Sequence, residues 1–184
     1  MSETQTILRC QQGDREAFQE LFGGYRDTAY RFSIGMLGSR QDALDIVQEA
    51  FLAAFRGIKR LEPERGFAGW FHGILRHLCL AQLRQRRPAV DPAVLERVSD
   101  GGPSPEAQVA EGERRAALLE CLGRLTARQR EVLVLRELEG LAYGEIATRL
   151  EIPAGTVMSR LYDARRALAR VLRDDPSLGN EEKK

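Results

Sequence analysis

The side chains best suited to bind a ligand specifically lie on one predicted helix near the C-terminus. Its outward positions combine hydroxyl and guanidinium groups, which bind phosphates and the edges of bases. These residues are Thr156, Ser159, Arg160, Tyr162, Arg165 and Arg166. The combination favours contact with duplex DNA. The alternative is a hairpin of an unrelated helical bundle, with its arginines in solvent.

The preceding residues have the apolar spacing of a helix-turn-helix. Ile146 and Leu150 face inward from its first helix, and Val157 and Leu161 face inward from its second. In such a unit the second helix lies in the major groove, with its early residues at the base edges. Glu151 occupies the turn position where glycine is usual. If Glu151 adopts the positive φ that glycine allows at this position, the strain is about 1 kcal/mol.

A second basic cluster lies on a helix predicted from Phe67 to Arg86. Aromatic and basic side chains together are typical of a surface that stacks bases and holds phosphates. The cluster consists of Trp70, Arg76, His77, Arg84, Arg86 and Arg87. The alternative for Trp70 is an ordinary place in the core of the domain.

A third group of side chains forms an acidic face on the helix that follows Ser39. It consists of Asp42, Asp45, Gln48 and Glu49, with Leu52 alongside. An acidic face that ends in an exposed leucine is unsuited to DNA and fits a basic protein partner. The alternative is an ordinary solvated face.

Little in the chain could support catalysis or hold a metal ion. The 184 residues include only two His, and Cys10, Cys79 and Cys121 form no Cys-x-x-Cys pair. No nucleophile motif or glycine-rich phosphate loop is present, so we expect no enzyme, no cofactor and no metal site. The thiols are expected to be buried. The chain has no signal peptide and no apolar run approaching ~18 residues, which predicts a cytoplasmic protein without membrane insertion.

The predicted secondary-structure elements all have helical periodicity. After a predicted N-cap at Asp14, apolar residues recur at steps of three and four until Gly38. Ser39 is predicted to cap the next helix. The apolar run 132–135 is expected to be helical, because its neighbours extend it past ten residues. The sequence therefore predicts an all-α fold.

Charge divides the chain into two domains. Residues 51–87 carry a net charge of +6 and residues 114–173 of +5, whereas residues 88–113 carry −5 and four prolines. This pattern predicts two small helical domains joined by a flexible acidic linker. Their predicted bounds are 1–87 for the first domain, 88–113 for the linker, 114–173 for a four-helix domain with the helix-turn-helix, and 174–184 for a polar tail.

Three motifs resemble those of the bacterial sigma-70 family of sigma factors. Asp42-Ala-Leu-Asp-Ile-Val-Gln-Glu-Ala-Phe-Leu is similar to the family's D-A-x-D-x-x-Q-E-x-F segment. Phe67-Ala-Gly-Trp-Phe-His-Gly-Ile-Leu-Arg resembles its promoter-melting segment, and Pro153-Ala-Gly-Thr-Val-Met-Ser-Arg-Leu resembles its −35 domain. The short chain of two domains is similar to the extracytoplasmic-function (ECF) group.

The resemblance implies a promoter-specificity subunit of RNA polymerase that melts the −10 element and binds the −35 element. It implies that the acidic face docks on the clamp helices of the β′ subunit and that the second domain meets the β flap. The Trp70–Arg87 helix and the loop before it would recognise the −10 element, and the helix from Ala154 would read the −35 element. The implied partners are core polymerase, promoter DNA and an anti-sigma factor.

Four residues depart from the family's pattern. His77 replaces a common Asn and Ala81 a frequent Asp, which predicts an altered base preference at the −10 element. Met158 and Asp163 replace residues that are commonly basic, which predicts a weaker or altered −35 contact. The alternative function is a stand-alone helix-turn-helix regulator, which would bind duplex DNA without polymerase and have no use for the acidic face.

Overall fold

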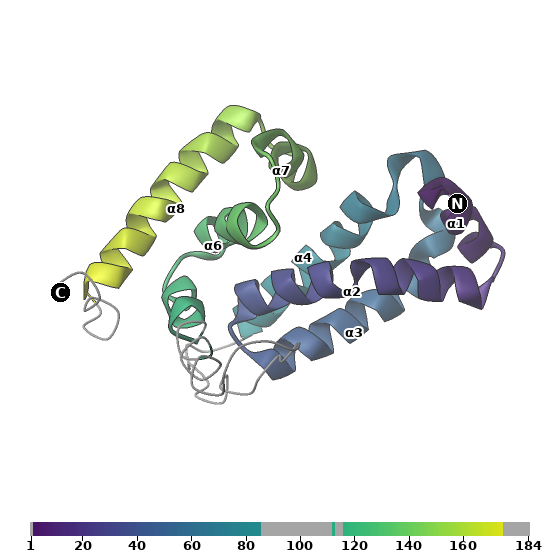
Figure 1. Cartoon of the computed structure of the whole chain (residues 1–184), viewed down its shortest axis with the longest axis horizontal. Coiled ribbons are helices and arrows are strands. Elements are labelled where there is room, and N and C mark those ends of the chain that lie inside the picture. The colour runs from purple at the N-terminus through teal and green to yellow at the C-terminus, as the bar shows by residue number, and fades with distance from the viewer. Residues whose placement is uncertain (1, 86–111, 113–115, 175–184) are drawn as a thin grey trace, which may run out of the picture.

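The fold of residues 2–85, 112 and 116–174 is described by a computed structural model (Figure 1). Every regular element in that part of the chain is helical, which confirms the all-α prediction. The predicted linker and tail, together with Arg86 and Arg87, fall almost wholly outside it. The first domain contains α1 (Glu3–Gln11), α2 (Arg15–Leu37), α3 (Arg40–Gly57), the 3₁₀ turns η1 (Ile58–Arg60) and η2 (Pro63–Arg65), and α4 (Phe67–Gln85).

The predicted caps set the ends of the first long helices. The carboxylate of Asp14 accepts hydrogen bonds from the backbone of Glu16 and Ala17, which fixes the start of α2. Gly38 ends α2 in a left-handed conformation with φ 66°, a geometry that glycine adopts without steric cost. The hydroxyl of Ser39 accepts from the Asp42 N–H and starts α3.

The first helix, α1, was not predicted from the sequence. It begins with a reciprocal capping box, in which Ser2 and Gln5 each bind the other's backbone N–H. Ile7 and Cys10 are buried from its inner face. The Ser-x-x-Gln spacing at the N-terminus was the signal that could have revealed it.

The second domain is also helical. It contains residues 116–123, α6 (Ala127–Leu133), the π-helical turn η4 (Val134–Leu138), α7 (Tyr143–Leu150) and α8 (Ala154–Asp174). The apolar run 132–135 is helical as predicted, because it is buried on all sides rather than alternating between core and solvent. Thr126 caps α6 through a box with Gln129.

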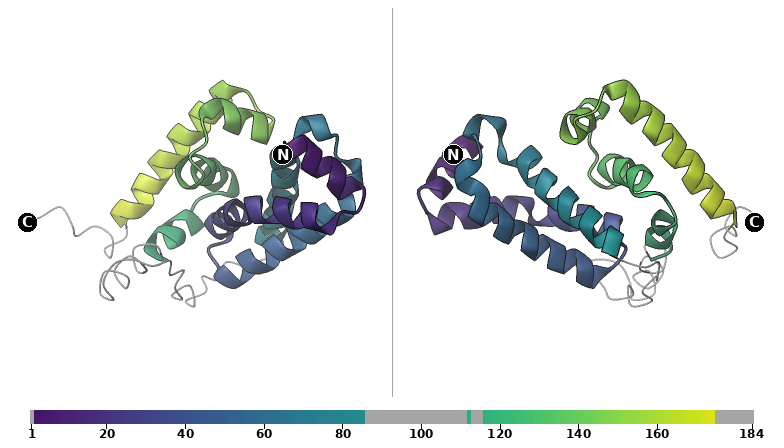
Figure 2. Two further views of the ribbon diagram at one scale, coloured as in Figure 1. Left: turned by 45° about the vertical axis from the view of Figure 1, so that its right-hand side comes forward. Right: turned by 180° about the vertical axis from the view of Figure 1, so that it is seen from behind.

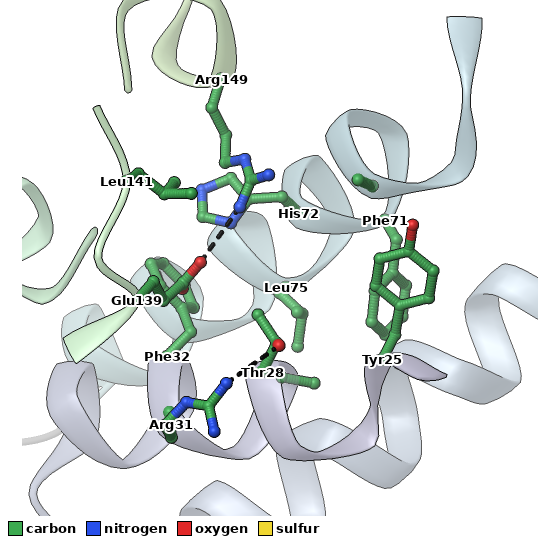
Figure 3. A pocket seen from close by; sticks show the side chains of 12 residues that line it. Tyr25, Thr28, Arg31, Phe32, Phe71, His72, Leu75, Glu139, Leu141 and Arg149 are labelled. Carbon is green, nitrogen blue, oxygen red and sulfur yellow. Dashed lines mark hydrogen bonds and ion pairs between the residues drawn. The ribbon is translucent and has the colours of Figure 1, made fainter. Parts of the chain in front are cut away.

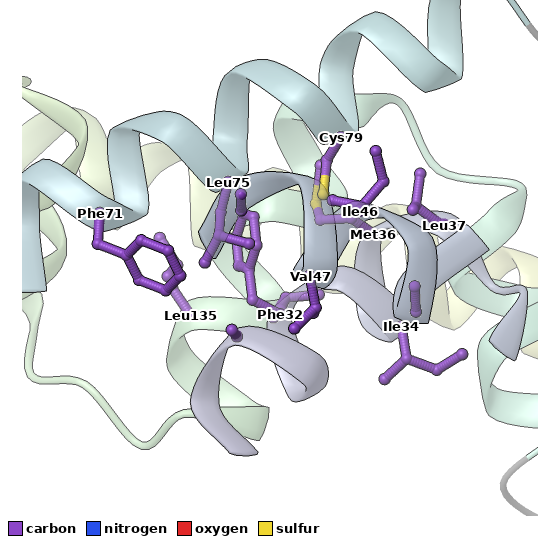
Figure 4. Packing of buried hydrophobic residues seen from close by; sticks show 14 of the residues in the cluster. Phe32, Ile34, Met36, Leu37, Ile46, Val47, Phe71, Leu75, Cys79 and Leu135 are labelled. Atoms are coloured by element: carbon purple, nitrogen blue, oxygen red, sulfur yellow. The ribbon is translucent and has the colours of Figure 1, made fainter. Parts of the chain in front are cut away.

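The two domains pack against each other. α6 and η4 lie on α2, and α7 lies on α4, while α8 runs along the outside of the second domain (Figure 2). Leu135 of η4 reaches the same buried cluster as Phe32 and Leu75 of the first domain (Figure 4). The buried guanidinium of Arg130 donates to the carbonyl of Met36 across this contact. The described residues thus share one continuous core.

The apolar side chains of α4 are buried to different degrees. Trp70, Ile74 and Leu78 pack against the core but are only partly buried. The fully buried positions are Phe67, Phe71, His72, Leu75 and Cys79. The reason is that α4 packs against α2 and α3 of its own domain and also against α7 of the second domain. Its apolar side chains are therefore divided between the two domains.

Candidate nucleic-acid and protein interfaces

The helix-turn-helix forms as predicted, from α7 and α8. Ile146 of α7 packs with Val157 and Leu161 of α8, and all three are fully buried. Glu151 joins the two helices with φ 54° and ψ 45°, so it adopts the left-handed conformation for which glycine is usual at this position. It is the one non-glycine residue with positive φ in the described chain. The unit therefore carries local strain at the turn.

The outer face of α8 presents most of the predicted DNA-binding side chains. Ser159, Tyr162, Arg165 and Arg166 are exposed, whereas Thr156 and Arg160 are half-buried. The guanidinium of Arg166 lies over the ring of Tyr162, with 5.6 Å between its central carbon and the ring centroid. Met158 and Tyr162 remain 57% and 61% exposed, so large apolar groups are interleaved with the cations.

Arg165 has an acidic partner within the second domain. It forms an ion pair of 2.8 Å with Glu137 of η4. Hydrogen bonds to Glu137 and Tyr143 raise the pKa of Arg165. The interaction holds this guanidinium against its own domain.

The predicted −10 residues of α4 are divided between solvent and the domain contact. His77 and Arg84 are exposed. Arg76 forms a 2.6 Å ion pair with Glu131 of α6, whose side chain is 1% exposed. The edge of Trp70 packs beside Gly57, where an added Cβ would lie 3.2 Å from the ring. Arg76 therefore faces the second domain, a placement that sequence spacing does not reveal.

The acidic face is exposed along α3, with one exception. Asp45, Gln48 and Glu49 are open to solvent and Leu52 is 47% exposed. Asp42 is half-buried, and its carboxylate accepts a hydrogen bond of 3.3 Å from Gln82 of α4.

Two apolar residues of α3 that sequence reasoning missed extend this face. Leu44 is 45% exposed and Phe55 is 52% exposed. Their spacing from Gln48 and Leu52 places all four on one side of the helix. The signal was the apolar type of both residues at steps of three and four from the predicted face.

A cavity of about 220 Å³ lies between the two domains, lined by Tyr25, Phe32 and His72 of the first and Glu139 and Arg149 of the second, among others (Figure 3). Glu139 and Arg149 form an ion pair of 3.0 Å. Burial raises the pKa of Glu139 to about 7, although Arg149 and Arg31 oppose the shift. Burial, with Arg149 and Arg76, lowers the pKa of His72 to about 3. The imidazole is therefore neutral at physiological pH.

Among the described residues, no group of three or more His, Cys, Asp or Glu side chains could hold a metal ion. The helices of that part of the chain include none that is long and apolar enough to cross a membrane. All three cysteines are buried free thiols, as predicted.

Comparison with known families matches both domains. Residues 21–88 match the model of "Sigma-70 region 2", and residues 115–168 match that of "Sigma-70, region 4". The first match contains α3 and α4, and the second contains the helix-turn-helix.

Comparison with individual proteins gives relatives of similar length. The chain is 31% identical to "ECF RNA polymerase sigma factor SigW" of Bacillus subtilis (strain 168), with 91% of this chain and 95% of that protein covered. It is 33% identical to "ECF RNA polymerase sigma-E factor" of Escherichia coli (strain K12), with 88% and 90% covered.

The fold is shared with a solved protein, CnrH, in the "Structure of CnrH in complex with the cytosolic domain of CnrY". The TM-score is 0.73 and the identity 23%, with 94% of this chain and 98% of that chain covered. The family is established by two findings. The models of sigma-70 regions 2 and 4 match the chain in that order, and the relatives span nearly its whole length. The protein belongs to the sigma-70 family, in the ECF group of RNA polymerase sigma factors.

Proposed function

We propose that this sigma factor binds core RNA polymerase through α3 and holds promoter DNA on α4 and α8. The observation that carries the proposal is the separation of charge on one chain. An exposed acidic and apolar face lies on α3, and a strongly basic helix lies at the outer edge of the helix-turn-helix. A promoter-specificity subunit needs both kinds of surface, because its two partners differ in charge.

The face on α3 suits a basic protein. Asp45 and Glu49 are exposed carboxylates that would steer a cationic helix toward α3. Leu52 then supplies the apolar contact that sustains an interface after water is excluded. On the resemblance described above, the partner surface is the clamp helices of the β′ subunit.

The helix α4 and the loop before it would hold the −10 element. An extruded base loses its stacking and pairing, which costs a few kcal/mol, and contacts with the protein must offset that cost. His77 and Arg84 are exposed to supply such contacts. Arg76 would have to leave Glu131 first, so we infer that the two domains separate when DNA is bound.

The outer face of α8 would read the −35 element as duplex. Ser159 and Arg160 are in the early part of the helix, which enters the groove in this type of unit. Arg166 extends the basic surface along the phosphates. Asp163 is exposed among these residues and would repel the DNA backbone.

An anti-sigma protein is a further proposed partner. The solved relative CnrH is in complex with CnrY, and a second, RpoE of Bartonella quintana, is in complex with the anti-sigma factor NepR. The interleaved Met158 and Tyr162 on α8 would suit the apolar side of such a protein.

Binding to core polymerase tests the first part of the proposal. The double variant Asp45→Lys with Glu49→Lys is expected to lose most of its affinity for core polymerase. The matched control is Glu16→Lys with Asp27→Lys, which makes the same charge change on exposed positions of α2. Equal affinity of the two double variants for core would contradict the assignment of α3.

A further inference from the structure

The segment between α3 and α4 is held by side chains of α1. This segment contains η1, η2 and Gly66, and it has only short 3₁₀ turns of its own. Such turns have poor hydrogen-bond geometry and low intrinsic stability. In Figure 1, α1 lies directly beside this stretch of chain and beside the start of α4.

Neither the residue before α4 nor its first turn supplies a side chain that could cap the N-terminus of this helix. The residue before it is Gly66, which has φ 72° and ψ 160° and no side chain, and the first turn of α4 contains no acidic residue. The missing acceptor comes from 64 residues earlier in the chain. Oε1 of Glu3 accepts a hydrogen bond of 2.8 Å from the Phe67 N–H.

Glu3 is itself fixed in place. Its other carboxylate oxygen, Oε2, accepts a hydrogen bond from the hydroxyl of Tyr25 on α2. The carboxylate thus links α1, α2 and α4. A negative charge at this end of α4 also interacts favourably with the helix dipole.

The other end of α1 holds the beginning of the same segment. Nε2 of Gln11 donates to the carbonyl of Ile58 at 3.0 Å and to that of Leu61 at 2.7 Å. Glu3 and Gln11 are eight positions apart, which is a rise of about 12 Å along the axis of α1. α1 therefore binds the segment at both ends.

We propose that Glu3 and Gln11 are positioning residues for −10 recognition. They fix the loop of residues 58–66 and the first turn of α4, and so set how strongly the protein discriminates between bases of the −10 element. The inference rests on the proposed function, in which this loop and α4 capture a base from the opened strand. Discrimination requires contacts that are in place before the base arrives, because a mobile loop adapts to any base.

The test is transcription by core polymerase with the full chain. A genomic library first supplies a strong promoter, which is then made with each of the four bases at every position of the −10 and −35 elements. Glu3→Ala is expected to reduce discrimination at the −10 positions by about fivefold. This factor corresponds to the loss of helix stability that typically follows the removal of one N-terminal cap. Discrimination at the −35 positions and the affinity for core should stay at the wild-type level.

Two further variants separate positioning from general damage. Glu3→Gln keeps an acceptor for the Phe67 N–H and is expected to restore most of the discrimination. Thr4→Ala, at an exposed neighbouring position of α1, is expected to behave as wild type.

Two results would overturn the inference. One is unchanged −10 discrimination in Glu3→Ala, and the other is an equal loss at every promoter, which is the effect of poor folding alone. The proposed function fails separately, if the wild-type chain starts no transcription from any promoter of the library.

Discussion

Glu151 holds the turn of the helix-turn-helix in a left-handed conformation, at φ 54°. Its Cβ crowds the following carbonyl there, which costs roughly 1 kcal/mol or more relative to glycine. The side chain is exposed, so its removal sacrifices no packing. Glu151 thus links a local strain to the unit that is proposed to bind DNA.

We expect Glu151→Gly to stabilise the folded protein by up to about 1 kcal/mol, because it relieves this strain. Chemical denaturation of the two proteins measures the difference. Thr148→Gly, on an exposed position inside α7, should instead destabilise, since glycine is unfavourable within a helix. If Glu151→Gly and Thr148→Gly lose equal stability, Glu151 is not strained.

Glu139 makes stability depend on pH. Its pKa is about 7 in the folded protein, against an ordinary value of 4.5. Between these values the folded state retains a proton that the unfolded state has released. The free energy of unfolding therefore falls as pH rises from about 4.5 to 7, by at most about 3 kcal/mol, and is constant above that range.

The variant Glu139→Gln should lack this dependence, and denaturation of both proteins from pH 5 to 8 measures it. The groups that face Glu139 are Arg149, Arg31 and His72. His72 has the opposite effect, because its pKa of about 3 in the folded state destabilises the protein as pH falls below 6.5. Both proteins share that effect, so their difference isolates Glu139. If the difference in free energy of unfolding between the two proteins is constant from pH 5 to 8, the pKa of Glu139 is not raised.

The basic face of α8 is interrupted by the exposed carboxylate of Asp163. We expect Asp163→Arg to tighten binding of the polymerase holoenzyme to promoter DNA, because a repulsive charge is replaced by a phosphate contact. The dependence of log affinity on log salt should steepen by about 1. Filter binding over a range of salt concentrations measures both quantities.

The control for this change is Asp174→Arg at the exposed end of the same helix, which should leave the −35 contact unchanged. If the two variants gain equally, the effect is one of net charge, and Asp163 does not face the −35 element.

Most elements could be predicted because their signals are local. Asp14, Ser39 and Gly38 determine helix ends within a few residues, and the turn at Glu151 follows from the spacing of its neighbours. The partner of Arg76 could not be predicted in this way. The partner, Glu131, is 55 residues away in the other domain. Helical spacing does not show which basic side chain forms an ion pair with which buried carboxylate.

The two domains share a core that their charge pattern did not predict. Apolar spacing shows that a helix has a buried face. It does not show whether that face is covered by the helix's own domain or by another domain. Gly35 of α2 lies at the closest approach. A Cβ added there would be 2.7 Å from Val134 of η4, so only glycine allows this contact.

We therefore expect Gly35→Ala to separate the domains and to reduce the free energy of unfolding by about 1–3 kcal/mol, as overpacking does. Small-angle scattering should show a larger radius of gyration. Gly73→Ala, on α4 with open space around it, should stabilise slightly and leave the radius unchanged. Equal radii for the two variants would mean that η4 shifts to accommodate the methyl group while the domains stay together.

Run-off transcription on a genomic library with mapped 5′ ends tests whether the chain directs core polymerase to promoters. Core polymerase with the wild-type chain should give discrete starts that core alone does not give. Those starts should disappear with Asp45→Lys and Glu49→Lys combined, and persist with Glu16→Lys and Asp27→Lys combined. No new starts, alongside tight binding of duplex DNA by the chain alone, would contradict the account and favour a stand-alone regulator.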